Sequence, residues 1–136
     1  MKFMMVQEAA TEVKVNGADQ VAAYMRDVAA MDRESVWVIH LNTRLHVIER
    51  EMISMGTVSG ALAHPREVFK GAIVRSASAI IMVHNHPSGD PTPSTADFTL
   101  TKNMVRAAKI LEIDFLDHVI VTPNGKAYSF AEHGTL

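Results

Sequence analysis

Segments whose apolar residues recur at helical spacing alternate along this chain with short apolar runs typical of strands. The order of these segments is compatible with only a few fold architectures. Apolar residues recur at helical spacing from about Ala18 to Met31, from His64 onward, and from about Thr95 to Leu111. Runs typical of strands lie at 36–41, 45–53, 80–84, 116–121 and 127–130. We therefore predict an α/β fold in which a mixed sheet is flanked by about three helices. The apolar stripe of the third helix predicts these buried residues: Phe98, Val105, Ala108 and Leu111.

The length of 136 residues suits one domain with a substantial core. We expect an N-terminal arm over residues 1–17 and a single domain over residues 18–136. The apolar segment Met1–Val6 could join copies of the chain, which makes a homo-oligomer a candidate assembly. This segment is shorter than the apolar core of a secretory signal, and Ala79–Val83 is too short to cross a bilayer. We expect a cytoplasmic protein with no membrane partner.

Charge and cysteine content restrict the chemistry further. The formal net charge of −2 provides no overall attraction to a phosphate backbone, which argues against direct nucleic-acid binding without excluding it. The chain has no cysteine, so a bound metal ion would need histidine, aspartate or glutamate ligands.

The stretch VHNHPSGDPTPSTAD, residues 83–97, carries the main chemical signal. His84 and His86 are separated by one residue at the end of a buried strand, so their side chains project to the same side. Three prolines then restrict the loop that follows: Pro87, Pro91 and Pro93. A histidine pair of this kind also arises by chance, so the spacing alone is weak support for a metal site.

Ser94 and Asp97 open the next helix with the spacing of a capping box, which by itself accounts for both residues. The same placement can bring the Asp97 carboxylate to the two imidazoles. Two neutral imidazoles and one carboxylate would leave a Zn²⁺ site positively charged with a free fourth position, the composition of a catalytic site. Asp90 is a further carboxylate in the loop, although Gly-Asp-Pro is a common turn sequence.

These residues resemble the JAMM motif of the MPN (Jab/MPN) metalloproteases, in which His-x-His-Pro is followed by Ser-x-x-Asp. The longer match HNHPSGDPTPS is similar to the RadC-like branch, traditionally labelled as DNA repair proteins. The likeness includes His64–Phe69 and Leu116–Val121 and covers roughly residues 18–130. Asn85 departs from many proteases of the wider family, which have Ser or Thr there. Full-length RadC-like proteins also resemble one another in a helix-hairpin-helix region that this chain has no room for, so we expect a fragment or a short member.

The resemblance implies a cytidine-deaminase-like MPN fold and a zinc-dependent hydrolase that cleaves a peptide or isopeptide amide bond with a metal-activated water. The substrate would be an unknown peptide or protein. By resemblance, the metal ligands are His84, His86 and Asp97, and Ser94 is the serine that stabilises the oxyanion. The general base of the family is a glutamate just after the first helix. Glu34 occupies that place, and its rivals on the next strand are Glu49 and Glu51.

Two other functions stay open. A metal-dependent phosphodiester hydrolase acting on nucleic acid would fit the traditional label but not the acidic net charge. A non-enzymatic MPN scaffold would not need the complete motif. The remaining histidines are interpreted as structural or exposed: His40, His46, His64, His118 and His133.

Overall fold

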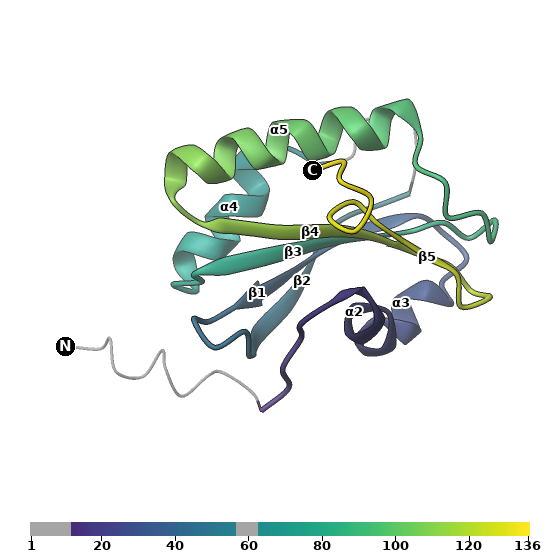
Figure 1. The fold of residues 1–136 in the computed structure, drawn as a ribbon, viewed down its shortest axis with the longest axis horizontal. Helices are drawn as coiled ribbons and strands as arrows, with labels where there is room; N and C mark the ends of the chain where they lie inside the picture. Colours follow the sequence, from purple (N-terminus) through teal and green to yellow (C-terminus); the bar gives the residue numbers. More distant parts are fainter. Residues whose placement is uncertain (1–11, 57–62) are drawn as a thin grey trace.

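The computed structural model describes residues 12–56 and 63–136, which form a sheet between two layers of helices (Figure 1). The helices are α2 (Ala18–Tyr24), α3 (Arg26–Ala29), α4 (Pro65–Val74) and α5 (Thr95–Leu111). The strands are β1 (Ser35–Leu41), β2 (Val47–Met55), β3 (Ala79–Asn85), β4 (Asp114–Val121) and β5 (Ala127–Ser129). The predicted α/β class is confirmed. The predicted first helix is divided at Met25, where φ of −103° and ψ of 24° interrupt the helical backbone.

The five strands form one mixed sheet in the order β2-β1-β3-β4-β5. β3 and β4 run parallel, and the other neighbouring strands are antiparallel. Every residue of β3 is buried, as expected for a central strand with helices on both faces. The strand that carries His84 and leads directly into His86 is therefore packed on both faces.

Side-chain alternation divides the core between the two faces of the sheet. Ile39 and Val83 belong to the cluster packed against α2 and α3, whereas Val38 and Met82 belong to the cluster packed against α4 and α5. In Figure 1 these two pairs of helices cover opposite faces. His84 lies two residues beyond Met82 and therefore projects toward the layer of α4 and α5.

The buried face of α5 differs from the predicted stripe, of which Ala108 is fully buried. Phe98 is 41% exposed and Leu111 is 43% exposed, and Val105 is only partly buried. The helix is instead buried at these positions: Asp97, Leu100, Thr101, Met104 and Ala108. The polar residues Asp97 and Thr101 face inward because they have polar partners there, a reason that apolar periodicity does not contain.

The segment before α2 also contacts the sheet. Lys14 forms an isolated bridge with His46, and Val15 is buried and donates its amide to the carbonyl of Leu45. The predicted apolar segment Met1–Val6 lies outside the described residues. Within residues 12–56 and 63–136, no helix combines the length and the apolar character needed to cross a bilayer.

Candidate metal centre

His84 and His86 are presented by the end of β3. His84 is the penultimate residue of the strand and is 1% exposed, and His86 follows the strand directly and is partly buried. The two imidazole rings meet edge to face, with centroids 4.8 Å apart. The histidine pair predicted from the sequence thus forms one polar group at the C-terminal end of the central strand β3.

Asp97 reaches both histidines from the first turn of α5. Its Oδ1 lies 3.1 Å from His84 Nδ1, and its Oδ2 lies 3.3 Å from His86 Nε2. The predicted capping box is also present, because the Ser94 amide donates to Asp97 Oδ2 and the Asp97 amide donates to Ser94 Oγ. The cap and the contact with the imidazoles are therefore compatible, since the cap fixes the carboxylate where it meets both rings.

The surroundings of Asp97 favour its ionised form. Burial by itself would raise the pKa of this carboxyl, but the rings of His84 and His86 and the Ser94 amide more than offset burial and hold the pKa well below its usual range. Asp97 is 1% exposed. An ionised carboxylate buried to this extent needs cationic partners or a bound cation.

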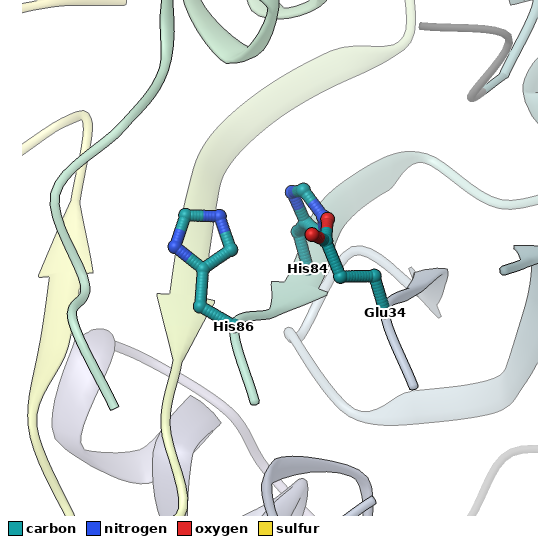
Figure 2. A group of neighbouring side chains, drawn as sticks. All are labelled: Glu34, His84 and His86. Carbon is teal, nitrogen blue, oxygen red and sulfur yellow. The ribbon is translucent and has the colours of Figure 1, made fainter. Parts of the chain in front are cut away.

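Glu34 approaches His84 from the opposite side. Its Oε1 lies 2.8 Å from His84 Nε2, and Figure 2 shows the carboxylate against the imidazole ring. The sheet explains this contact, because β1 is antiparallel to β3 and Val36 lies opposite His84. The residue just before β1 is thereby brought to the end of β3.

The two rival glutamates lie elsewhere. Glu51 Oε1 is 3.0 Å from His40 Nε2, and Glu49 Oε1 accepts a hydrogen bond from Arg75 Nε at 2.8 Å. His40 is four residues along β1 from Val36, the residue opposite His84, which is about 13 Å in an extended strand. The structure brings Glu34, and neither rival, to the histidine pair.

The loop after β3 orients the ring of His86. Its Nδ1 donates to the backbone carbonyl of Asp90 at 2.9 Å, which leaves Nε2 to face Asp97. Asp90 thus contributes its carbonyl group to the centre. Burial lowers the pKa of His86, but the Asp97 carboxylate and the Asp90 carbonyl more than offset burial and raise it. A histidine nitrogen must be deprotonated to bind a metal ion, so metal binding at Nε2 would compete with protonation there.

The donor atoms suit a cation. Glu34, His84 and His86 each offer one ligand atom, and these atoms lie within 4.8 Å of one another. His84 Nδ1 is buried without an aligned hydrogen bond although Asp97 Oδ1 is close to it. In a tetrahedral zinc site two ligand atoms lie about 3.3–3.5 Å apart. The two contacts of Asp97 with the imidazoles are near this spacing.

A cleft of about 650 Å³ opens beside Glu34. The residues that line it are Asp32, Arg33, Glu34, Met55, Gly56, Pro87 and Ser88. Glu34 retains 40% exposure of its side chain, so solvent reaches its carboxylate while His84 stays buried. The cleft therefore gives access to the Glu34 side of the centre.

A buried layer behind the centre was not assigned a functional role from the sequence. His118 on β4 is fully buried, stacks on Phe130 with centroids 4.5 Å apart, and lies 6.2 Å from the ring of His84. Thr101 Oγ1 is 2.6 Å from His118 Nδ1. The proximity of His118 to the centre follows from the pairing of β3 with β4, which places Met82 opposite His118 and Ile120 opposite His84. Knowledge of this strand pairing would have been needed to predict it.

Comparison with known proteins identifies the class to which this fold and centre belong. The RadC-like JAB domain family matches residues 15–135. The chain belongs to this family, as the resemblance in the motif predicted.

Relatives carry the name UPF0758 protein. The one from Pelodictyon phaeoclathratiforme is 47% identical over 124 residues, which are 90% of this chain and 55% of the relative. The one from Desulforamulus reducens is 50% identical over 106 residues, 78% of this chain and 47% of the relative. The one from Thermotoga maritima is 44% identical over 123 residues, 90% of this chain and 55% of the relative. The chain thus spans about half the length of these curated relatives.

Proposed function

We propose that this chain is a zinc-dependent hydrolase of the JAMM type that cleaves a peptide or isopeptide amide bond. The observation that supports this most is the position of His84 between two carboxylates. Glu34 lies at its Nε2, and Asp97 lies at its Nδ1 and also reaches His86. This arrangement separates one partly exposed carboxylate from one buried carboxylate, which suits a proton carrier and a metal ligand respectively.

The residues present fit zinc. With no cysteine in the chain, the ligands would be the imidazoles of His84 and His86 and the carboxylate of Asp97. Ligands with a total charge of −1 leave the ion net positive and a fourth position free. Bound zinc would supply Lewis acidity that lowers the pKa of a coordinated water toward about 7.

The side chains of the chain account for the proton transfers. Glu34, beside the cleft, takes a proton from the attacking water and later donates it to the leaving amine. Ser94 Oγ accepts from the Asp97 amide, so its hydroxyl proton remains free to donate to the oxyanion of a tetrahedral intermediate.

The test compares Glu34 with its two rivals in protein purified without a histidine tag. Wild type should contain about one zinc per chain. Glu34→Gln should keep the zinc and lose turnover at least about 100-fold, because general base catalysis contributes roughly 10²–10⁴-fold. Glu49→Gln and Glu51→Gln should retain turnover, and His84→Ala should lose both zinc and turnover. Full activity of Glu34→Gln would refute the assignment of the base.

The substrate class needs a parallel assay of peptides, isopeptide-linked proteins and labelled DNA and RNA. Cleavage of a peptide or isopeptide bond that depends on zinc and on Glu34 supports the proposal. Cleavage restricted to nucleic acid would replace it with phosphodiester hydrolysis. Stoichiometric zinc with no turnover on any of these substrates would count against an enzymatic role.

A further inference from the structure

Asn85, between the two histidines, connects β3 to the chain around Glu34. In a strand its side chain points to the opposite side from His84, and it is fully buried. The Ser35 amide and the Ser35 hydroxyl both donate to Asn85 Oδ1, each at 2.7 Å. Asn85 Nδ2 donates to the carbonyl of Arg33 at 2.8 Å. One side chain therefore holds the residues on both sides of Glu34.

The hydrogen bonds leave this segment little freedom. Both lone pairs of the Asn85 carbonyl are used by Ser35, whose hydroxyl also accepts from Trp37 Nε1 at 3.0 Å. The carbonyl of Glu34 itself accepts from the Gly56 amide at 2.8 Å. The backbone is thus fixed at three successive residues, while the Glu34 side chain keeps 40% of its surface exposed.

The position of Asn85 has a geometric consequence. The same strand end presents His84 to one side and, through Asn85, holds the Glu34 segment on the other. Any movement of Arg33 or Ser35 would change the 2.8 Å contact between Glu34 Oε1 and His84 Nε2. A misplacement of about 1 Å in a catalytic group can lower a rate about 100-fold.

We propose that Asn85 is the positioning residue of Glu34: its amide sets the location of the base relative to the histidine pair without contacting the reacting atoms. This inference rests on the proposed hydrolytic function for its kinetic part. Its structural part concerns the contact between Glu34 and His84 and is measurable without any substrate.

The kinetic test uses Asn85→Ala and a matched control, Asn42→Ala. Asn42 Oδ1 also accepts two backbone amides, those of Arg44 and His46, but it lies in the turn between β1 and β2. Asn85→Ala should keep one zinc per chain and lower turnover 10- to 100-fold, whereas Asn42→Ala should leave turnover within about twofold. In a Glu34→Gln background Asn85→Ala should cause no further loss, because it acts only through Glu34. A further loss in that background, or loss of zinc, would overturn the proposal.

The second readout is spectroscopic and uses the metal-free protein. The ¹⁵N chemical shift of His84 Nε2 should move in Asn85→Ala toward its value in Glu34→Gln, and the Ser35 amide should exchange with solvent faster. Asn42→Ala should change neither. Unchanged values in Asn85→Ala would overturn the proposal even if the protein hydrolysed nothing. An inactive wild type with the expected spectral changes would instead refute the hydrolase and leave the positioning role intact.

If Asn85→Ala does not fold, the nearly isosteric variant Asn85→Asp tests the same positioning role. Its carboxylate keeps the acceptor that Ser35 uses, no longer donates to the Arg33 carbonyl, and places a negative charge against that oxygen. Turnover reduced at least tenfold with zinc retained, and no further loss with Glu34→Gln, supports the proposal. Wild-type turnover in Asn85→Asp overturns it.

Discussion

Thr101 Oγ1 and His118 Nδ1 lie 2.6 Å apart in the interior between α5 and β4. The Thr101 hydroxyl donates to the carbonyl of Asp97 at 2.8 Å, so it accepts its second bond from a protonated Nδ1 of His118. This assigns the Nδ1–H tautomer to a neutral His118. The pair also ties the helix turn that carries Asp97 to the sheet behind His84.

Replacing Thr101 by Val should destabilise the fold. The substitution keeps the side-chain shape but leaves the Nδ1–H of His118 buried without an acceptor, which costs about 1–3 kcal/mol. The free energy of unfolding in urea measures this loss. Thr99→Val on the exposed side of the same helix is the control and should cost less than about 0.5 kcal/mol. Equal costs for the two variants would contradict a stabilising hydrogen bond between Thr101 and His118.

Folding stability should decrease as the pH is lowered because of His118. Burial, with a further contribution from the charge of His84, lowers the pKa of His118 from 6.5 to about 3. Below pH 6.5 the unfolded chain binds a proton at this residue that the folded chain does not bind until about pH 3. The contribution of His118 to the free energy of unfolding therefore decreases by up to about 1.4 kcal/mol for each unit by which the pH is lowered between 6.5 and about 3.

Unfolding titrations with a chelator present, from pH 7 to pH 4, would measure this effect in wild type and in His118→Asn. The asparagine amide can still donate to Thr101 but does not titrate, so the variant should show the smaller pH dependence. The same slope in both proteins would show that His118 does not remain neutral in the folded state.

Zinc should stabilise the folded chain, because the ligands come from two elements that only folding brings together. At a free zinc concentration about 100 times Kd the gain would be about 2.7 kcal/mol. A thermal unfolding scan should show this as a higher melting temperature that a chelator reverses. His84→Ala and Asp97→Asn should lose the response, whereas Glu34→Gln and the exposed-site control His64→Ala should keep it. A full response in Asp97→Asn would exclude this carboxylate as a ligand.

Sequence alone was sufficient where the determining interactions are local. The capping box of Ser94 and Asp97 depends on a spacing of three residues, and the predicted helix from Thr95 to Leu111 has the same bounds in the structure. The alternation of residues in a strand likewise predicted that His84 and His86 would lie together.

The buried polar contacts could not be predicted from the sequence in this way. Thr101 was not expected in the core because its partner His118 lies 17 residues away in the sequence. Phe98 was expected to be buried, but it is 41% exposed although its ring meets that of Phe130 edge to face, with centroids 5.3 Å apart. The amide of Asn85 contacts residues about 50 positions earlier in the chain. Such pairs follow from how strands and helices pack, which residue periodicity does not specify.

The alignment of Val36 with His84 across β1 and β3 sets the distance between the two halves of the centre. A displacement of β1 by two residues would keep every side chain on its original face of the sheet. It would nevertheless carry Glu34 about 7 Å along the strand direction. Insertions or deletions of two residues in β1 are therefore compatible with an intact hydrophobic core and incompatible with the centre, so the offset between these strands is as much a component of the site as its side chains.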